Sequence, residues 1–514
     1  MASITATKIN ETYYMIDADD GDILYAIDNH FSVMEDGAQF STAFKLKRWD
    51  GKKHFFNPRS RMMPIGLTEE LVEFCKKRRY DLKFKNVPDV VDWITLDELH
   101  ELEKKYMAGS GITPRDYQEA AVMAALNQRR GILECCTSSG KSLMIYLIIR
   151  TLMEKKDLKH ILLVVPSIML VTQMYKDFES YGWTDLADFV EQQDKDHIPT
   201  FNKPVLITTW QSLTKQDVLF FEKQQCIICD EAHSSRGNIL NSIVKFCSEA
   251  TFRIGTTGTL PTSLADKFSV KSVLGKTLYK ITSRELIDRG YLTEIVIANM
   301  FLQYPMDFIL SNQERSYPEE VRMVEEYEDR KTILKTIMDH SPKDHNTLIL
   351  CNHVDHVDAT VEYLKEIAPD REIKKITGSV KSAEREFIRV SAEETDGMVI
   401  VATFGTMSTG VNIKKIHQII LYANSRSKIK VLQSLGRGLR KHPDKKKIII
   451  YDIVDDLRWK SVRGKVHTNY LYEHWLERSK YYIEQEFSQK SATIRLYQEA
   501  PKTEVSEQKK KFLK

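Results

Sequence analysis

The hydrophobic positions between about residues 131 and 255 fall into short runs that are separated by amphipathic stretches. The runs are GILEC at 131–135, HILLVV at 160–165, PVLITT at 204–209, QCIIC at 225–229 and FRIG at 252–255. Runs of this length without polar alternation are typical of strands buried on both faces. The stretches between them, such as 143–153 and 168–181, carry apolar residues at helical spacing. Alternating strands and helices predict βαβ units and a parallel sheet covered on both sides.

A second series of the same kind begins near residue 295. Its runs are EIVIANMFL, NTLILC at 346–351, EIKKI at 372–376, MVIVAT at 398–403, QIILY at 418–422 and KIIIYDIV at 447–454. We therefore expect two parallel-sheet α/β domains in tandem, at 109–282 and 283–457. Residues 1–108 combine alternating runs with helical stretches near 67–79 and 96–107, which predicts a small α+β domain. Residues 458–514 predict a helical extension rich in Tyr and Lys, followed by a disordered tail.

The composition narrows the class of protein. A chain of 514 residues is too long for one hydrophobic core, and 42% hydrophobic with 29% charged residues is ordinary for a globular protein. The sequence contains no apolar run of about 18 residues and no secretory pattern at its start, so we expect neither a membrane span nor secretion. Its seven irregularly spaced cysteines fit a reducing compartment. Cys226 and Cys229 lie within an apolar run, which favours burial on a strand over a metal or redox site.

Basic residues are concentrated near the start of the chain. The formal charge of the whole chain is only +3, so a surface for a polyanion requires local segregation of charge. Residues 45–85 include 13 basic and only 5 acidic residues, with aromatic residues interleaved. This segment suits contact with a DNA duplex or junction, although a solvated charged face is an alternative. The leading candidates, which we expect a loop to bring together near Trp49, are Lys52, Lys53, Arg59 and Arg61.

The run at 131–135 leads into a candidate phosphate loop and then an apolar helix. Its residues are Thr137, Ser138, Ser139, Gly140, Lys141 and Ser142. A phosphate cradle needs a tight turn of outward N–H groups, a helix amino terminus, a lysine and a hydroxyl for Mg²⁺. Cys135 stands where the common pattern has its first glycine. Taken alone, the Gly-Lys-Ser triplet leaves a chance turn as an alternative.

Acidic and basic groups that could complete a nucleotide site follow later in the chain. Asp230 ends the run at 225–229, where an aspartate can hold Mg²⁺, and Glu231 beside it can polarise a water for attack on a γ-phosphate. A solvated strand end is the alternative for both acids. Arg437 and Arg440 are three residues apart, so on a helix they share one face. From the second domain they could act as arginine fingers.

The ordered set of motifs over about 110–455 resembles the superfamily 2 helicases and translocases of the DEAH-containing kind. Residues 115–118 resemble the Q motif that reads adenine, 140–142 motif I, 230–233 motif II, 402–412 motif V and 433–440 motif VI. The stretches at 285–292 and 435–441 are similar to the branch containing the XPB repair helicases. The whole chain, including its basic front domain, resembles the UvsW-type helicases of T-even phages. Ser138 and Ser139 depart from the family, which often has a glycine in this turn.

The resemblance implies two RecA-like motor domains and ATP-dependent remodelling of branched DNA (forks, Holliday junctions and R-loops) in recombination, repair and replication control. It implies ATP and Mg²⁺ as cofactors, with Ser142 and Asp230 as the metal ligands. The implied nucleotide contacts are Arg115, Gln118, Thr137, Ser138, Ser139, Gly140, Lys141, Ser142, Gly410 and Asn412. The implied catalytic residues are Lys141, Asp230, Glu231, His233, Arg437 and Arg440. Thr209 and Trp210 match a motif that grips a nucleic-acid strand.

The resemblance also implies partners and a location. Branched and single-stranded DNA, RNA–DNA hybrids, and phage recombination proteins or a small accessory protein are the expected partners of a monomeric chain in the bacterial host cytoplasm. Three alternatives stay open: an RNA helicase, an annealing protein with a weak ATPase, and a nuclease motor. The last rests on Pro88-Asp89 and Glu103-Lys104-Lys105, but leucines at 96, 99 and 102 place Glu103 on an amphipathic helix, whereas a nuclease needs carboxylates that converge at a strand.

Overall fold

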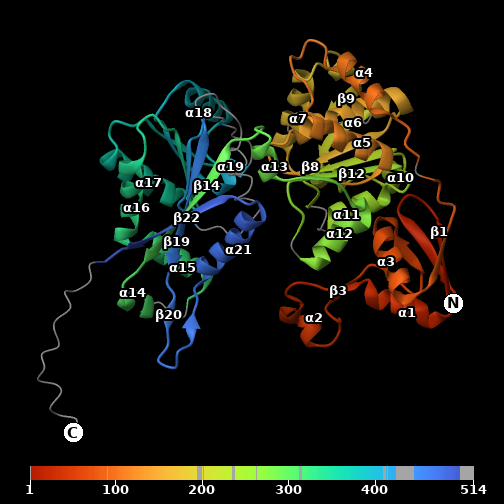
Figure 1. The fold of residues 1–514 in the computed structure, drawn as a ribbon, viewed down its shortest axis with the longest axis horizontal. Helices are drawn as coiled ribbons and strands as arrows, with labels where there is room; N and C mark the ends of the chain where they lie inside the picture. Colours follow the sequence, from red (N-terminus) through yellow and green to blue (C-terminus); the bar gives the residue numbers. More distant parts are fainter. Residues whose placement is uncertain are drawn as a thin grey trace, which may run out of the picture. The chain divides into compact units, whose positions relative to one another are not determined.

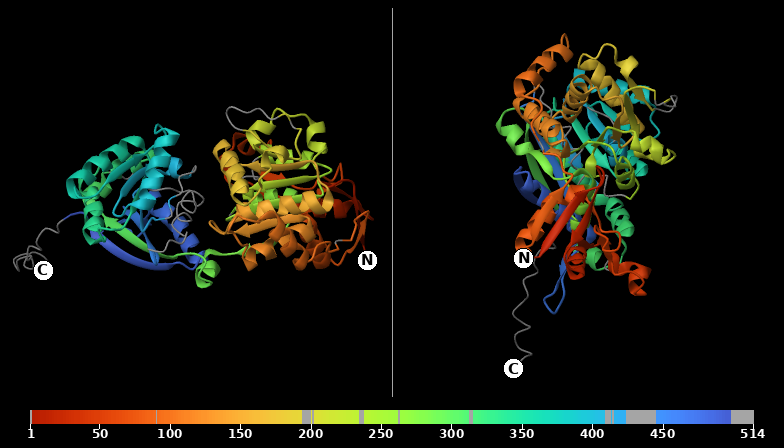
Figure 2. Two further views of the ribbon diagram at one scale, coloured as in Figure 1. Left: turned by 90° about the horizontal axis from the view of Figure 1, so that it is seen from above. Right: turned by 90° about the vertical axis from the view of Figure 1, so that its right-hand side faces the viewer.

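The computed structural model describes residues 2–89, 91–193, 200, 202–233, 238–261, 263–311, 315–408, 413, 415–423 and 445–497. The chain divides into two compact units, Met1–Thr282 and Ser283–Lys514. Each unit contains a large parallel sheet with helices on its faces (Figures 1 and 2). Within the described ranges, no helix combines the length and the apolar character that crossing a bilayer requires.

The first unit is built on a seven-stranded sheet in the order β13-β7-β12-β11-β8-β10-β9, in which every neighbouring pair is parallel. Its strands are β7 (Arg130–Cys135), β8 (Ile161–Val165), β9 (Val190–Gln192), β10 (Val205–Thr209), β11 (Cys226–Asp230), β12 (Phe252–Thr257) and β13 (Thr277–Ile281). The five predicted strands are all present, and β9 and β13 are added at the two edges. The central strands are buried on both faces, as their unbroken apolar runs predict.

Helices cover both faces of this sheet (Figure 1). On one face, α5 (Asp116–Gln128), α6 (Lys141–Lys156) and α7 (Ile168–Ser180) pack side by side. On the other, α12 (Leu264–Leu274) packs against α11 (Asn238–Phe246), which contacts the short helices α9 (Trp210–Leu213) and α10 (Val218–Glu222). A further short helix, α8 (Leu186–Phe189), precedes β9. Cys226 and Cys229 are fully buried on β11, which confirms the interpretation of these residues as core cysteines.

The N-terminal domain is α+β, as predicted. Its sheet has the order β5-β2-β1-β6, with β3 and β4 forming a separate antiparallel pair. The strands are β1 (Ser3–Lys8), β2 (Tyr13–Ala18), β3 (Ser32–Met34), β4 (Lys52–His54), β5 (Met62–Pro64) and β6 (Asp81–Lys85). The helices are α1 (Gly21–His30), α2 (Thr42–Lys45) and α3 (Thr68–Arg78), with 3₁₀ turns η1 (Ala38–Phe40) and η2 (Ile65–Leu67).

This domain is packed directly onto the parallel-sheet domain of the same unit. Ala265 and Phe268 of α12 belong to the hydrophobic core of the N-terminal domain. Gly66 allows the closest approach, because a Cβ there would lie 2.0 Å from the carbonyl oxygen of Lys271. The buried Arg253 guanidinium donates to Thr12 Oγ1 at 2.9 Å. These contacts join the front domain to the sheet domain as one body.

Helix α4 (Leu96–Tyr106) connects the two parts of the first unit and packs on α5 and α6. A capping box of Thr95 and Glu98 begins the helix. Near its end, Tyr146 of α6 donates its hydroxyl hydrogen to the Tyr106 carbonyl at 2.9 Å. The helix is therefore attached to the helical layer that also carries the candidate phosphate loop.

The second unit holds another seven-stranded, all-parallel sheet, in the order β16-β17-β15-β18-β19-β14-β22. Its strands are β14 (Glu294–Gln303), β15 (Thr347–Cys351), β16 (Ile373–Ile376), β17 (Val399–Thr403), β18 (Gln418–Leu421), β19 (Lys447–Asp456) and β22 (Ser488–Arg495). The described helices are α13 (Ser283–Asp288), α14 (Met306–Leu310), α15 (Tyr317–Glu325), α16 (Thr332–His340), α17 (Val354–Ile367), α18 (Ser382–Glu394), α19 (Phe404–Ser408) and α21 (Tyr470–Glu484), with a 3₁₀ turn η4 (Glu328–Lys331).

The C-terminal extension contains the predicted helix, α21, and three strands that were not predicted. A small antiparallel pair, β20 (Trp459–Lys460) and β21 (Val466–His467), precedes α21. Arg478 of α21 forms a buried ion pair with Asp452 of β19, with 2.7 Å between Nη2 and Oδ1. The strand β22 then pairs with β14 from Val296↔Ser488 to Gln303↔Arg495. The extension is thereby part of the second unit's fold.

Candidate functional site

The candidate phosphate loop joins β7 to α6 and has a tightly turned backbone. Ser138 and Gly140 have φ angles of +67° and +85°. Gly140 caps α6, and a Cβ at this position would lie 2.2 Å from Gln118 Nε2, so only glycine fits both the angle and the space. Ser138 adopts the left-handed region of the backbone, which is a strained conformation for serine. The loop thus has the shape of a cradle although a serine occupies the turn.

The first turn of α6 offers groups that favour an anion. Lys141 is the first residue of this 16-residue helix, and its Nζ lies 3.3 Å from the Cys135 carbonyl oxygen, to which it donates. The unpaired N–H groups and the positive end of the helix dipole point toward the loop. Ser139 Oγ is buried without a hydrogen-bond partner among the described residues. A buried polar atom of this kind, beside Thr137 and Ser142, fits a polar ligand in the loop.

The start of α5 is hydrogen-bonded to the same loop. Gln118 Nε2 and the Tyr117 hydroxyl both donate to the carbonyl oxygen of Ser139, at 2.9 and 2.7 Å. Gln118 Oε1 accepts from the backbone N–H of Arg115 at 2.9 Å, and an Arg115 guanidinium N–H donates to Tyr117 at 3.2 Å. The residues that resemble a Q motif therefore fix the loop's backbone. Tyr117 was not among the predicted site residues, although the motif in which it lies was.

Replacing Gln118 with alanine is expected to raise KM for ATP by roughly 30-fold, because the loop loses one hydrogen bond to a buried carbonyl and the helix loses its cap, at about 1 kcal/mol each. The dependence of ATP turnover on ATP concentration measures this change. The control is Gln128→Ala, at the opposite end of α5, for which KM should not change.

The acidic residues lie at the carboxyl end of β11. Asp230 Oδ1 accepts a hydrogen bond from Thr256 Oγ1 of β12 at 2.7 Å. Glu231 has a φ of +51°, a left-handed conformation that is rare outside glycine and is often found at functional sites. His233 Nδ1 lies 3.3 Å from Glu231 Oε2 and 3.1 Å from Thr257 Oγ1. His233 thus bridges the acidic motif to β12.

The charges of the loop and of the acids act on each other. Burial lowers the pKa of the Lys141 ammonium, but the Glu231 and Asp230 carboxylates outweigh burial and hold that pKa above its ordinary value. Burial and the neighbouring Glu231 raise the pKa of Asp230. Burial also acts to raise the pKa of Glu231, but Lys141 and the hydrogen bond with His233 bring it below its ordinary value. Lys141 therefore stays charged and Glu231 stays an ionised acceptor.

The structure brings Lys141, Asp230, Glu231 and His233 to one end of the first unit's sheet, with the Q-motif residues behind the loop. Four predicted site residues lie outside the described residues: Gly410, Asn412, Arg437 and Arg440. The roles of all these residues remain predictions.

The predicted strand-gripping residues occupy the end of β10 and the start of α9. The Thr209 hydroxyl is buried and accepts from the Ser212 N–H at 3.4 Å, so it caps α9. The Trp210 side chain is half-buried against the core of the sheet domain. Any contact of Thr209 with nucleic acid would therefore involve the backbone of this turn more readily than its hydroxyl.

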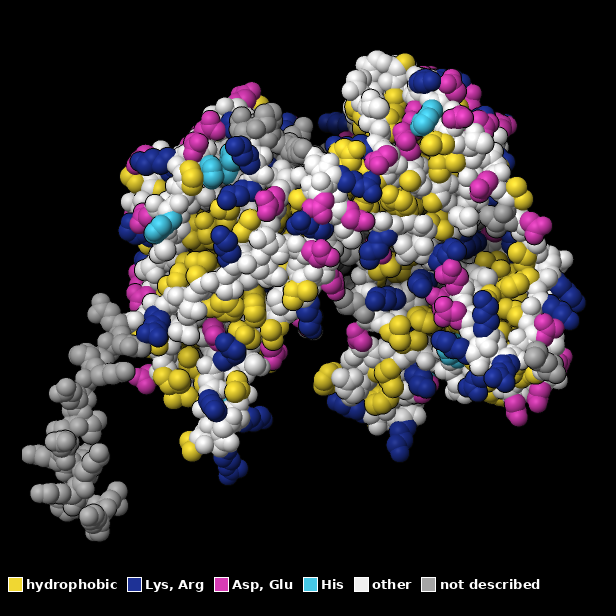
Figure 3. Space-filling model, viewed as in Figure 1, with side chains coloured by type: hydrophobic (Ala, Val, Ile, Leu, Met, Phe, Trp, Pro, Cys, Tyr) yellow, Lys and Arg dark blue, Asp and Glu magenta, His cyan; other side chains and the backbone are white. Residues whose placement is uncertain are grey.

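The four basic candidates of the N-terminal domain are in different environments. Lys52 and Lys53 are half-buried on β4, where the Trp49 indole N–H donates to the Lys52 carbonyl at 2.9 Å. Arg59 and Arg61 are exposed, and Arg61 pairs with Asp17 at 2.8 Å. A pocket of about 590 Å³ is lined by Lys53 and by residues 54–58 and 60. On the side of the N-terminal domain that Figure 3 shows, Lys and Arg side chains are mixed with acidic and apolar ones.

Three family models match the chain in the order of its domains. "DNA helicase UvsW, N-terminal" matches residues 9–85, "Type III restriction enzyme, res subunit" matches 111–262 and "Helicase conserved C-terminal domain" matches 329–442. Among curated proteins, the ATP-dependent DNA helicase UvsW of Enterobacteria phage T4 is 30% identical over 488 residues, covering 91% of this chain and 94% of the phage protein. The chain belongs to the UvsW family of ATP-dependent DNA helicases. The resemblance seen in the motifs is confirmed.

Solved structures agree with this membership. The match to the crystal structure of T4 UvsW covers 96% of this chain and 100% of the T4 chain, with a TM-score of 0.50 and 27% identity. The helicase MrfA bound to DNA covers 79% of this chain and 52% of its own, with a TM-score of 0.52 and 17% identity, which supports the fold alone. The two parallel sheets are thus the tandem RecA-like domains of a UvsW-family helicase, and ATP is the nucleotide that the family uses.

Proposed function

We propose that this chain couples ATP hydrolysis to the unwinding and remodelling of branched DNA, namely forks, Holliday junctions and R-loops, in recombination, repair and replication control. The observation that carries the proposal is the convergence of Lys141 on Asp230 and Glu231 in a chain of the UvsW family. A half-buried lysine at a helix amino terminus beside two strand-end acids suits the binding and hydrolysis of a nucleoside triphosphate.

Each residue of the loop and of the acidic motif has a role in this proposal. The N–H groups of Thr137, Ser138 and Gly140 and the hydroxyl of Ser139 hold phosphate oxygens, and Lys141 neutralises the β- and γ-phosphates. Glu231 polarises the attacking water, and His233 links the state of the nucleotide to β12. The oxygen donors of Ser142 and Asp230 fit Mg²⁺ and would hold it. The ion supplies neutralisation of phosphate charge.

The second domain and the nucleic-acid surfaces complete the proposal. Arg437 and Arg440 are proposed as arginine fingers, and Gly410 and Asn412 as further nucleotide contacts. Thr209 and Trp210 grip one DNA strand without reading bases. Lys52, Lys53, Arg59 and Arg61 contact the duplex or junction. We propose that the chain is a monomer that works in the host cytoplasm on branched and single-stranded DNA and on RNA–DNA hybrids. Phage recombination proteins or a small accessory protein are its proposed protein partners. We further propose that its functional domains divide at residues 108, 282 and 457.

ATP turnover and strand separation across single-stranded, duplex, forked, four-way and R-loop substrates test the function. We expect branched DNA to stimulate both activities above the level with linear duplex, and DNA to exceed a matched RNA fork. Stimulation by RNA but not by DNA forks would instead indicate an RNA helicase. Cutting of DNA with Mg²⁺ and without ATP would indicate a nuclease.

A further inference from the structure

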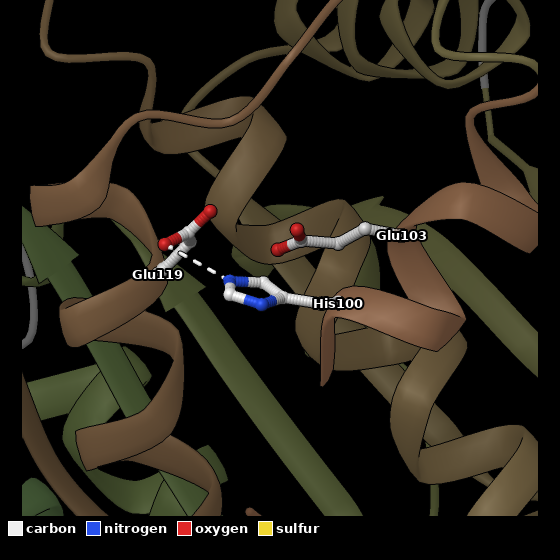
Figure 4. Close-up of side chains that lie close together, drawn as sticks. All are labelled: His100, Glu103 and Glu119. Carbon is white, nitrogen blue, oxygen red and sulfur yellow. Dashed lines mark ion pairs between the residues drawn. The ribbon is translucent and has the colours of Figure 1, made fainter. Parts of the chain in front are cut away.

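Helices α4 and α5 bring together three side chains that can bind a metal ion, apart from the nucleotide site. They are His100 and Glu103 of α4 and Glu119 of α5 (Figure 4). His100 and Glu103 are three residues apart and so lie on one face of α4, which packs against α5. One ligand atom from each side chain lies within 4.8 Å of the others. The arrangement joins residues from two helices at a single point.

The spacing of these atoms suits a small divalent ion. Zinc binds nitrogen and oxygen ligands at about 2.0–2.2 Å, so two ligands of a tetrahedral ion lie roughly 3.4 Å apart. His100 Nε2 and Glu119 Oε2 are 3.4 Å apart. A carboxylate oxygen of Glu103 lies within 4.8 Å of both, and its carboxylate is directed toward the other two groups (Figure 4).

The burial of Glu103 is an independent sign that a ligand is needed. Its relative exposure is 7%, and its Oε1 atom is buried without a hydrogen-bond partner among the described residues. A buried carboxylate without partners is costly, since charges in protein interiors are normally paired or bound to a metal. Burial and the neighbouring Glu119 carboxylate raise the pKa of Glu103 to about 7. A cation at this point would compensate both carboxylates at once.

We propose that His100, Glu103 and Glu119 bind a divalent transition-metal ion, with Zn²⁺ as the best fit, that fastens α4 to α5. One imidazole and two carboxylates, with a fourth position for water, match the preferences of zinc, whereas Mg²⁺ and Ca²⁺ favour all-oxygen sites. None of the seven cysteines binds this ion, because all seven are buried elsewhere in the core. Glu119 directly follows Gln118, so the ion stabilises the helix that holds the candidate phosphate loop.

Equilibrium dialysis of the full chain against Zn²⁺, without nucleotide or Mg²⁺, tests the site. We expect one tightly bound ion per chain in the native protein, and affinity at least tenfold lower in both Glu103→Gln and His100→Ala. The matched control is Glu101→Gln, which removes a carboxylate from the same helix. The Glu101 side chain is 75% exposed and paired with Lys104, so binding should be unchanged.

Two further measurements separate loss of the site from loss of the fold. Far-UV circular dichroism should be the same for Glu103→Gln and the native chain, and Zn²⁺ should raise the unfolding temperature of the native chain but not that of the variant. Co²⁺ in place of Zn²⁺ should give an absorption spectrum without a thiolate charge-transfer band. A native chain that binds no Zn²⁺, variants that bind it as tightly as the native chain, or a thiolate band would each overturn the proposal.

Discussion

Replacing Lys141 with alanine is expected to lower ATP turnover on the order of 10²–10³-fold and to abolish DNA unwinding. The physical reason is that the positively charged Lys141 ammonium lies beside Asp230 and Glu231, and both carboxylates stabilise its charged form. Without it, the phosphates of ATP would meet two acids with only backbone N–H groups to offset them. DNA-stimulated phosphate release measures turnover, and a fluorescent forked duplex measures unwinding.

The control for this experiment is Lys155→Ala, which removes a lysine from the last turn of the same helix. Lys155 pairs with Glu98 at 3.0 Å and lies more than three helical turns from the loop, so turnover should stay at the native level. Binding of forked DNA should survive in both variants, which shows that the loss lies in the chemistry. Unwinding by Lys141→Ala at the native rate would contradict the motor interpretation and favour an annealing protein with a vestigial site.

The buried strands of both sheets could be predicted from sequence because burial on two faces leaves an unbroken apolar run. The runs at 160–165 and 398–403 correspond to β8 and β17 within one residue. The strand β22 could not be predicted in this way. It lies at an edge of the sheet and has the sequence SQKSATIR. Its first six residues are exposed, so its sequence carries no apolar run that would predict a strand. It is a strand because β14 offers it a free edge, and polar residues on such an edge discourage further pairing.

The same distinction applies to the site. Lys141, Asp230 and Glu231 lie within short motifs directly beside strands, so sequence order was enough to single them out. The contact of Tyr117 with Ser139 joins residues 22 positions apart, and His100 and Glu119 come from separate helices. Such pairs depend on how helices pack, which helical spacing does not specify. Glu103 did stand out in the sequence, but as part of a nuclease pattern and not as a metal ligand between two helices.

Replacing Arg330 with methionine is expected to destabilise the second unit by about 3–5 kcal/mol. Arg330 is 1% exposed and its partner Asp455 is fully buried. The guanidinium donates to both Asp455 oxygens, at 2.9 and 3.0 Å, and to the Tyr422 carbonyl at 2.8 Å. Methionine would fill similar volume but leave the Asp455 carboxylate in the core without its guanidinium partner, although the Tyr304 hydroxyl still donates to it at 2.6 Å.

Hydrogen exchange of the β19 amides, followed by mass spectrometry, measures this loss at the ion pair itself. Protection should fall by about two to four orders of magnitude, since 1.4 kcal/mol corresponds to a factor of ten. Adding Asp455→Leu to Arg330→Met should recover much of the protection, because the charge left uncompensated is then gone. The exposed pair of Lys335 and Asp339 on α16 is the control, and Lys335→Met should change protection by less than about 1 kcal/mol. If Arg330→Met had as small an effect as Lys335→Met, the buried pair would not hold η4 to β19.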